Sequence, residues 1–284
     1  MRPVGGSGLL HWAKYTAWYL FTASCAAVFA APVVFMVVGS LKPDDRVLAE
    51  AGGWRAFVPG HASLQNYHDV FARVDFGLFF LNSAVIVGAI VAGGLVVNSL
   101  AGYAFARMRW RGRDALFAAV LALLIIPFEA IAVPLFYEVS LFGWRNTYVV
   151  QIAPFVANAF SIYLFYTFFL GMPRELEEAA RMDGAGFFHT FFRIIVPNAR
   201  PVFATVTILS FLMFWGSYLW PLLVTSGPAV RPLPVAVAEF KTLPPLKWGD
   251  ILAFGVMMVA PALLIFVFFQ RWFIRGVVSS GIKG

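Results

Sequence analysis

Cysteine and charged residues are both scarce in this sequence. The chain has one cysteine, Cys25, so no disulfide can form within it and a thiolate metal site is not expected. Charged residues make up 12% of the chain, against roughly 25% in an average soluble domain. Hydrophobic residues make up 61% of the 284 residues, and the mean hydropathy is +0.81. So much apolar surface excludes an ordinary soluble domain and indicates a bilayer as the solvent.

Motifs for nucleotide binding and for catalysis are also absent. The chain contains no G-x-x-x-x-G-K-[ST] phosphate loop, and the dipeptide Gly-Lys does not occur in it. The absence of H-E-x-x-H or another paired catalytic motif within the apolar runs disfavours an intramembrane enzyme. His61 and His68 have no cysteine or spaced carboxylate nearby to complete a metal site. We therefore expect no enzyme activity, no cofactor and no metal in this chain.

Six apolar runs are long enough to cross a bilayer as helices, which takes about 17–25 residues. The apolar part of the first run exceeds the roughly 7–15 residues of a signal-peptide core, so it is expected to be retained as a span. The sequence thus predicts an all-α integral membrane protein with six transmembrane helices. The runs are Tyr15–Leu41, Leu78–Ala106, Ala115–Phe142, Tyr148–Leu170, Val202–Thr225 and Ile251–Phe273.

The distribution of Lys and Arg predicts the orientation of these spans. With the N-terminus inside, the inside segments hold 13 Lys and Arg in 66 residues, and the outside segments hold 8 in 65. The clearest signal is the loop after the second run, where residues 107–113 contain four arginines. Because basic residues favour the cytoplasmic side, both termini are expected in the cytoplasm. The predicted parts are a cytoplasmic segment 1–14, a six-span domain 15–273 that includes a cytoplasmic loop 171–200, and a cytoplasmic tail 274–284. The basic charge is explained by topology, and no nucleic-acid motif accompanies it.

The cytoplasmic loop 171–200 is predicted to be a helix–turn–helix. Pro173 suits a first helical turn, and three glutamates follow it at the positively charged helix N-terminus. Gly184, preceded by Asp183, is expected to stop the first helix in a left-handed conformation. Phenylalanines from Phe187 to Phe192 recur at helical spacing, and Pro197 is expected to end the second helix. A small apolar stripe is predicted on the first helix, formed by Leu176, Ala179, Ala180 and Met182.

Prolines and small residues within the spans carry further signals. Ala84, Gly88 and Ala92 recur every four residues, a spacing that lets another helix approach closely. Each proline removes a backbone hydrogen bond, which a neighbouring helix or a wet cavity has to replace. Their number favours a protein with a pathway or moving helices: Pro127, Pro134, Pro154, Pro221 and Pro261.

The loop also carries a spaced motif. Glu178-Ala179-Ala180, three residues, Gly184, nine residues and Ile194-Ile195-Val196-Pro197 resemble the "EAA" loop of permease subunits of bacterial binding-protein-dependent ABC importers. The family pattern is E-A-A, three residues, G, nine residues, I-x-L-P, and Val196 is the one departure. Residues 63–67 resemble the family's "T-L-x-N-Y" segment, and residues 101–107 resemble its "A-Y-A-F-A-R" end of the second span. The tail from residue 270 to residue 284, which ends in Gly-Ile-Lys-Gly, is similar to the family's "G-x-x-K-G" terminus. These segments are similar to the carbohydrate-uptake class, which includes the second permease of the maltose importer.

The resemblance implies how such a chain would be driven. A separate ABC ATPase dimer, which binds ATP and Mg, would receive the first loop helix in a surface cleft. Glu178 would hold this docking contact, Ala179 and Ala180 would permit close approach, and Gly184 would allow the turn. The other motif residues implied at this coupling site are Met182, Asp183, Ile194 and Pro197. Further implied partners are a second, different permease subunit, an extracytoplasmic solute-binding protein and a carbohydrate, all at a bacterial cell membrane.

Polar and aromatic residues within the spans are candidates for the substrate pathway. Placing a carboxylate at mid-bilayer costs about 2.5–3.5 kcal/mol of insertion free energy, so such a group needs a partner or a water-filled cavity. Glu129 lines the pathway or makes a structural hydrogen bond between helices. Asn158, Ser217 and Tyr218 are further candidates, and Trp215 and Trp220 could stack on sugar rings or belong to an interfacial aromatic belt. Gly216 departs from relatives, which commonly have Asn there.

Other readings of the sequence differ in substrate or in energy source. The transported solute could be a polyol or a glycerol phosphate. A stand-alone secondary transporter is disfavoured because no internal repeat of interrupted half-helices is apparent. An ATPase that co-purifies with the chain would separate an importer subunit from a secondary transporter.

Overall fold

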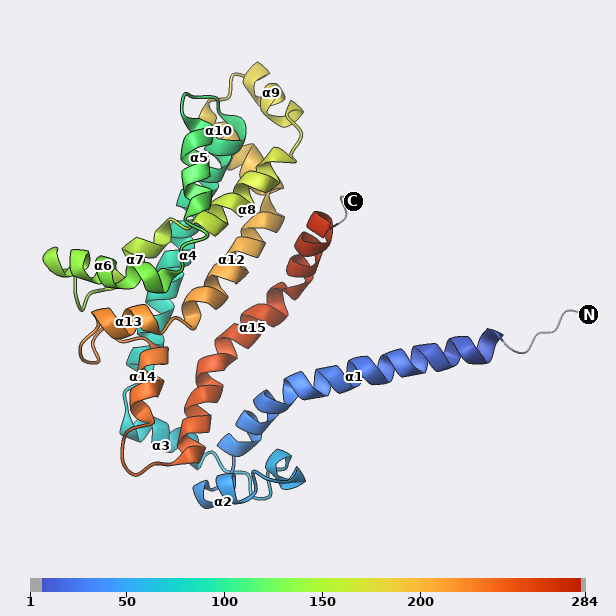
Figure 1. Cartoon of the computed structure of the whole chain (residues 1–284), viewed down its shortest axis with the longest axis vertical. Coiled ribbons are helices and arrows are strands. Elements are labelled where there is room, and N and C mark those ends of the chain that lie inside the picture. The colour runs from blue at the N-terminus through green and yellow to red at the C-terminus, as the bar shows by residue number, and fades with distance from the viewer. Residues whose placement is uncertain (1–6, 282–284) are drawn as a thin grey trace, which may run out of the picture. The chain divides into compact units, whose positions relative to one another are not determined.

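The computed structural model describes residues 7–281, which form helices and connecting turns without any strand (Figure 1). They divide into two units, one formed by the residues up to Asp75 together with Phe240–Met257, the other by Phe76–Glu239 and the residues from Met258 onward. The first unit contains α1 (Ser7–Ser40), α2 (Asp44–Ala49), the 3-10 helix η1 (Trp54–Phe57) and α3 (Gln65–Arg73). The second contains α4 (Phe76–Arg107), α5 (Arg113–Ala122), α6 (Phe128–Leu141), α7 (Tyr148–Val156), α8 (Ala159–Leu170), α9 (Glu175–Met182), α10 (Phe187–Thr190), the π-helix η2 (Phe191–Ile195), α11 (Val196–Asn198), α12 (Arg200–Trp215), α13 (Leu219–Val224) and most of α14 (Leu233–Phe240). Helix α15 (Trp248–Gly281) contributes to both units.

Four helical segments of the described chain are long and apolar enough to cross a membrane. They are Lys14–Ser40, Phe76–Arg107, Tyr148–Leu170 and Trp248–Phe269. A fifth is added if Phe187–Asn198 and Arg200–Trp215, which meet at a bend of 79°, count as one broken span. Four of the six predicted apolar runs thus correspond to long helical segments, and the third and fifth runs do not.

The third run, predicted as one continuous helix, consists of two. Helix α5 ends at Ala122, and α6 begins at Phe128 after Pro127, whose backbone is extended at φ −67° and ψ 141°. Proline lacks an N–H and disfavours helical backbone in the residue before it, here Ile126. The fifth run is interrupted at Gly216–Tyr218, between α12 and α13.

The fourth run is interrupted at Ala157–Asn158, and a side chain of α4 bridges the interruption. Asn98 Nδ2 donates to the carbonyl of Val156 at 3.0 Å, and Asn98 Oδ1 accepts from the backbone N–H of Asn158 at 2.9 Å. The Asn158 side chain caps α8 by accepting from the backbone N–H of Ser161 at 2.9 Å. A broken helix inside an apolar layer is tolerated when its freed backbone groups find such partners.

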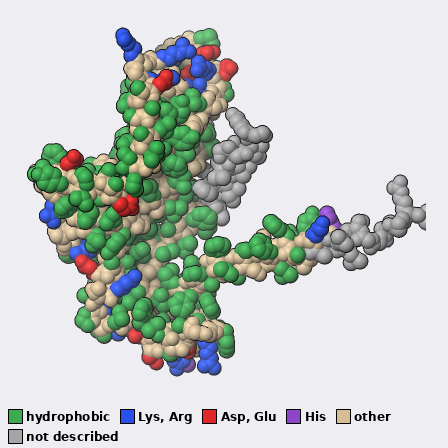
Figure 2. Space-filling view, viewed as in Figure 1, with side chains coloured by type: hydrophobic (Ala, Val, Ile, Leu, Met, Phe, Trp, Pro, Cys, Tyr) green, Lys and Arg blue, Asp and Glu red, His purple; other side chains and the backbone are tan. Residues whose placement is uncertain are grey.

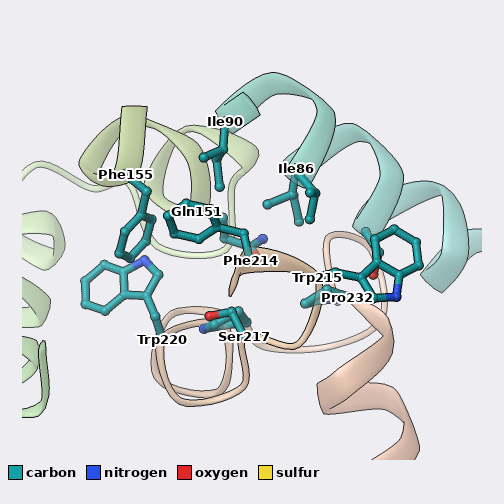
Figure 3. A pocket seen from close by; sticks show the side chains of 12 residues that line it. Ile86, Ile90, Gln151, Phe155, Phe214, Trp215, Ser217, Trp220 and Pro232 are labelled. Atoms are coloured by element: carbon teal, nitrogen blue, oxygen red, sulfur yellow. The ribbon is translucent and has the colours of Figure 1, made fainter. Parts of the chain in front are cut away.

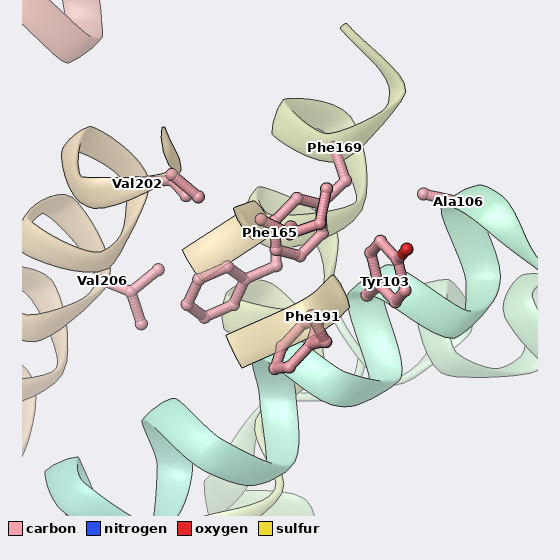
Figure 4. Close-up of a cluster of buried hydrophobic side chains, with 9 residues drawn as sticks. Tyr103, Ala106, Phe165, Phe169, Phe191, Val202 and Val206 are labelled. Carbon is pink, nitrogen blue, oxygen red and sulfur yellow. The ribbon is translucent and has the colours of Figure 1, made fainter. Parts of the chain in front are cut away.

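Helix α4 packs against α8 through glycine. A Cβ atom on Gly102 would lie 2.6 Å from Phe165 Cβ and 2.9 Å from the backbone nitrogen of Tyr166, so only glycine fits there. Around this crossing, Tyr103, Phe165, Phe169 and Phe191 form a buried cluster (Figure 4). The stripe expected to pack, Ala84, Gly88 and Ala92, is instead exposed within this chain. The four-residue spacing of small residues did not reveal that α4 packs through Gly102 and not through Ala84, Gly88 and Ala92.

The segment before α14 is buried by polar side chains of α4 and α7. Asn82 Nδ2 donates to the carbonyl of Arg231 at 2.9 Å, and Gln151 Nε2 donates to that of Val230 at 2.8 Å. Ser83 Oγ accepts from the backbone N–H of Leu233 at 2.8 Å. Part of the segment between the predicted fifth and sixth runs is helical, and its residues 232–236 are buried. These hydrogen bonds allow irregular backbone to be buried at low cost.

In the first unit, polar contacts hold the connections between helices. Asn66 Nδ2 donates to the carbonyls of Ser40 and Lys42, both at 2.7 Å. Arg73 Nη1 pairs with the fully buried Asp250 at 2.8 Å. Asn66 lies in the segment that resembles the family's outside loop, and its role here is to join α3 to the end of α1.

Candidate functional site

The predicted first loop helix is present as α9, and its end has the expected geometry. The helix starts with Glu175, Glu177 and Glu178 in its first turn. Gly184 adopts φ +76°, the left-handed region that glycine enters without strain. The N–H of Ala185 bonds to the carbonyl of Ala180 at 2.9 Å, and the N–H of Gly184 bonds to that of Arg181 at 3.0 Å. These are the two bonds of a Schellman motif, so the predicted glycine stop is confirmed.

The two faces of α9 differ in exposure. Glu177 and Ala180 are buried against the rest of the unit. Glu178, Ala179 and Asp183 are exposed, and the side chain of Met182 is 83% exposed. The residues of the expected apolar stripe therefore differ in their surroundings, because Ala180 is buried whereas Ala179 and Met182 are exposed. The outward face carries four of the eight predicted coupling residues: Glu178, Ala179, Met182 and Asp183.

The second helix of the loop is more irregular than expected. It runs as α10, the π-helix η2 and α11, and it continues through Pro197 to Asn198 rather than ending at the proline. The π turn changes the bonding register just before Pro197, and Asn198 Nδ2 donates to the carbonyl of Ile194 at 2.7 Å. Ile194 is half-buried and Pro197 is exposed. The end of this helix is set by the 79° bend into α12.

The last turns of α4 contact both parts of the loop. Arg107 Nε lies 3.2 Å from Glu177 Oε1 on α9, and Arg107 Nη2 donates to the carbonyl of Met172. The Tyr103 ring lies 5.1 Å from the Phe191 ring, measured between centroids. In the space-filling view, charged side chains gather at the end of the unit that carries α9, and hydrophobic ones cover the helices next to it (Figure 2). This end presents the only dense acidic helix among the described residues of the unit.

A small cavity lies where the broken fourth and fifth runs meet α4. Figure 3 shows Trp220, Phe155 and Ser217 around this space, with Ile86 and Ile90 of α4 opposite them. The centre of a water molecule can reach about 20 Å³ of it, and about 10–15 Å³ suffices for one water. The cavity therefore accepts a group of about hydroxyl size, not a sugar ring. Its lining is Ser83, Ile86, Val87, Ile90, Gln151, Phe155, Phe214, Trp215, Ser217, Trp220, Pro221 and Pro232.

Three of the predicted pathway residues, Trp215, Ser217 and Trp220, line this cavity. Both indole N–H groups are bound to backbone: Trp220 Nε1 donates to the carbonyl of Val150 at 2.8 Å, and Trp215 Nε1 to that of Met258 at 2.8 Å. Their ring faces thus contribute an apolar wall.

The other three candidates lie away from the cavity lining. Glu129 is exposed in the first turn of α6, Asn158 caps α8, and Tyr218 is exposed in the turn before α13. The structure therefore does not bring the six candidates together in one place.

Gln151 and Ser83 line the cavity but were missed by the sequence analysis. Gln151 is buried, and its Oε1 has no hydrogen-bond partner although its Nε2 is bound to Val230. A buried amide oxygen without a partner is uncommon, and Gln151 is one of the polar side chains, with Ser217, that line the cavity. Polar residues within apolar runs could have marked both positions. Among the described residues, no group of three His, Cys, Asp or Glu side chains could hold a metal ion.

The chain is similar in sequence to a family of transport proteins and to individual permeases. The model of a family described as "binding-protein-dependent transport system inner membrane component" matches residues 94–279. The arabinooligosaccharides transport system permease protein AraQ of Halalkalibacterium halodurans is 34% identical over 279 residues, covering 98% of each chain. The sn-glycerol-3-phosphate transport system permease protein UgpE of Yersinia pestis is 32% identical over 258 residues, covering 87% of this chain and 89% of its own.

The fold also resembles a solved structure. A chain of a bacterial ABC transporter involved in the import of the acidic polysaccharide alginate superposes with a TM-score of 0.82. The likeness covers 96% of this chain and 100% of the other, at 21% identity, so it shows a shared fold.

Proposed function

Because this chain belongs to the family of inner-membrane components of binding-protein-dependent transport systems, we propose that it is the transmembrane permease subunit of an ATP-driven carbohydrate importer. The observation that carries the proposal is α9, an exposed acidic helix with a glycine stop on a chain without a phosphate loop. A pump without its own nucleotide site needs a surface through which another protein drives it, and α9 offers one.

The proposed topology has six spans, with both termini in the cytoplasm of a bacterial cell. The spans are α1, α4, α5 with α6, α7 with α8, α12 with α13, and α15. The arginine-rich loop after α4 supports an inside location for the α4 end. The coupling loop then lies on the same cytoplasmic side, because Arg107 at that end contacts Glu177.

The proposed mechanism is rigid-body coupling. An ABC ATPase dimer, binding ATP and Mg, would close and move α9, and α9 would move the helices packed against it. Glu178, Ala179, Met182 and Asp183 face outward and are the proposed docking residues. Gly184, Ile194 and Pro197 shape the turn and the second helix. A second, different permease would complete the pathway, and a solute-binding protein would deliver the substrate.

The cavity beside Gln151 is the proposed substrate contact of this chain. Sugar binding needs hydrogen-bonding groups between apolar walls, which Gln151, Ser217 and Trp215 supply. Its small volume indicates that the helices separate when a sugar ring passes. Glu129, Asn158 and Tyr218 remain proposals for later points of the pathway.

Glycerol phosphate is the second candidate substrate, since UgpE is a relative at 32% identity. A phosphate would require cationic partners, but no Lys, Arg or His lines the described cavity. This lining favours a neutral carbohydrate over a phosphate ester, and a polyol would fit the same chemistry.

Purification of the tagged chain from its native membrane tests the proposal. We expect an ATPase and a second permease to co-purify, and the binding protein of the system to bind neutral sugars in a ligand screen. Sugar uptake that continues without ATP, or a chain that purifies without any ATPase, would contradict the proposal and favour a secondary transporter.

A further inference from the structure

The ion pair between Arg107 and Glu177 is unusual in its burial. The Arg107 side chain is 5% exposed and the Glu177 side chain 10%, and Nε and Oε1 lie 3.2 Å apart. Neither of these two atoms has a hydrogen bond in the described structure. A buried pair of this kind gains little net stability, because removing both charges from water is costly. The effect of the pair is therefore to fix the position of α9 relative to α4.

Arg107 contacts both ends of the connection into α9. Its Nη2 donates to the carbonyl of Met172, in the turn after α8, while its Nε faces Glu177 in the first turn of α9. Two contacts from one planar guanidinium restrain both the location and the orientation of the helix. The α9 helix therefore cannot shift relative to the end of α4 without breaking a buried contact.

Tyr103, one turn earlier on α4, holds the other half of the loop. Its ring centroid lies 5.6 Å from that of Phe187 and 5.1 Å from that of Phe191. On its other side it lies 5.5 Å from Phe169 of α8, and Figure 4 shows Tyr103 close to Phe191 and to the Phe165 and Phe169 rings of α8. The last two turns of α4 thus contact both helices of the loop.

Neighbouring glutamates on α9 face different surroundings. Glu177 is buried against Arg107, whereas Glu178 is exposed on the outward face with Met182. Successive helical residues point about 100° apart, so one glutamate can be held internally while the next remains free to meet a partner. In the acidic first turn of α9, Glu177 therefore contacts α4 within this chain, while Glu178 is available to a partner.

We propose that Arg107 and Glu177 form a positioning pair that makes α9 and α4 move as one body. The inference rests on the proposed coupling role of α9 and adds the residues that transmit its motion. A displacement of α9 by the ATPase would be passed directly to α4, the helix that lines the cavity with Ile86 and Ile90. Without the pair, α9 would move while α4 followed only partly.

Spin labels on the assembled importer test the pair without knowledge of the substrate. Cys25 is replaced by alanine, and nitroxides are attached at Met108→Cys, just after the end of α4, and at Glu175→Cys, on α9 but outside the proposed docking residues; both positions are exposed in this chain. We expect the distance distribution between them to stay narrow on addition of ATP in the parent protein. It should broaden in Arg107→Gln and in Glu177→Gln, and an unchanged distribution in both variants would overturn the proposal.

In the same assembly, coupling is measured as the factor by which the binding protein stimulates ATP hydrolysis. In each single variant this stimulation should be lower by a factor of about five or more, because a typical coupling free energy changes an equilibrium by at least about that factor. The conservative Arg107→Lys variant and the reversed pair, Arg107→Glu with Glu177→Arg, should recover part of it. If neither recovers any, the pair has no positioning role. The matched control is the pair Arg113–Asp114, whose side chains are more exposed than those of Arg107 and Glu177, at 32% and 86%; its neutralisation should change neither measurement.

A second variant separates this inference from the proposed function. Gly184→Val disturbs α9 itself and should abolish the stimulation if α9 is the coupling helix. Normal stimulation in Gly184→Val would refute the coupling role. Lost stimulation in Gly184→Val together with full stimulation in Arg107→Gln and Glu177→Gln would refute only the positioning pair.

Discussion

The indole N–H of Trp220 donates a hydrogen bond of 2.8 Å to the carbonyl oxygen of Val150. Val150 lies four residues before Pro154 in α7, and proline has no N–H with which to bond that carbonyl. A side chain from α13 thus replaces the helical donor that the proline removes. This contact joins the broken fourth and fifth runs at the edge of the cavity.

Trp220→Phe should therefore destabilise the chain through both lost packing and a lost hydrogen bond. Phenylalanine leaves the space of the five-membered ring empty, and the buried Val150 carbonyl loses its donor, at a cost of about 1–3 kcal/mol. Pro154→Ala restores the helical donor and should reduce that cost, so the two substitutions should be non-additive in a double-mutant cycle. Thermal unfolding of the detergent-solubilised chain measures this. Trp18→Phe, at a position that is 63% exposed on α1, is the control. If the effects of Trp220→Phe and Pro154→Ala are additive, the hydrogen bond does not replace the donor that the proline removes.

Gly102→Ala should disrupt the packing of α4 against α8. The added Cβ would lie 2.6 Å from Phe165 Cβ and 2.9 Å from the Tyr166 backbone nitrogen, neither of which can move freely. Overpacking of this kind typically costs about 1–3 kcal/mol. Gly88→Ala is the matched control, since an added Cβ there meets nothing within 4 Å. An equal melting temperature for the two variants would contradict the packing shown here.

Gly184→Val should leave the chain inserted and assembled but uncouple ATP hydrolysis from uptake. No atom lies within 4 Å of the added Cβ, so the effect comes from the left-handed φ of +76°, which costs an L-residue about 1–2 kcal/mol. Gly186→Ala, at φ −75° and also without close neighbours, should behave as the parent. Paired measurements of uptake and ATP hydrolysis decide the matter, and normal uptake by Gly184→Val would refute the role of the turn.

The pair Asp69–Lys247 should stabilise the first unit across neutral pH without a pH dependence of its own. Lys247 Nζ donates to Asp69 Oδ2 at 2.7 Å, and this hydrogen bond lowers the pKa of Asp69 and raises the pKa of Lys247. The carboxylate contribution is present above the unfolded pKa of about 3.9 and is lost as the pH falls through the lower folded value. The ammonium contribution is present below about 10.4 and is lost as the pH rises through the higher folded value.

Melting temperatures of the parent and of Asp69→Asn at three pH values test this pair. Both groups are partly exposed, so the difference should correspond to about 0.2–1 kcal/mol. It should be the same at about pH 5, 7 and 9, which all lie between the two unperturbed pKa values. Lys241→Gln, at an exposed position nearby, is the control. A difference that changes within this range would show that another group titrates with the pair.

The helix–turn–helix of residues 171–200 was largely predictable because its signals are local. Three glutamates in a first turn, a left-handed glycine and a helical phenylalanine repeat depend on backbone preferences that neighbouring residues express by themselves. The structure confirms the predicted first helix, α9, and the left-handed conformation of Gly184. It differs at Pro197, because a π turn and a side-chain donor from Asn198 let the helix continue.

The sequence by itself determined that the chain is an all-helical protein with long apolar segments, because hydropathy and periodicity are read along the chain. Only the tertiary structure decided which small residues pack, which glutamate is buried and where runs break. Gly102 packs whereas Gly88 does not, Glu177 meets Arg107 whereas Glu178 stays exposed, and Asn98 bridges an interruption 60 residues away. These outcomes depend on side chains distant in sequence meeting across helices, and in an apolar layer a backbone N–H or C=O group freed from a helix is costly unless such a side chain bonds to it.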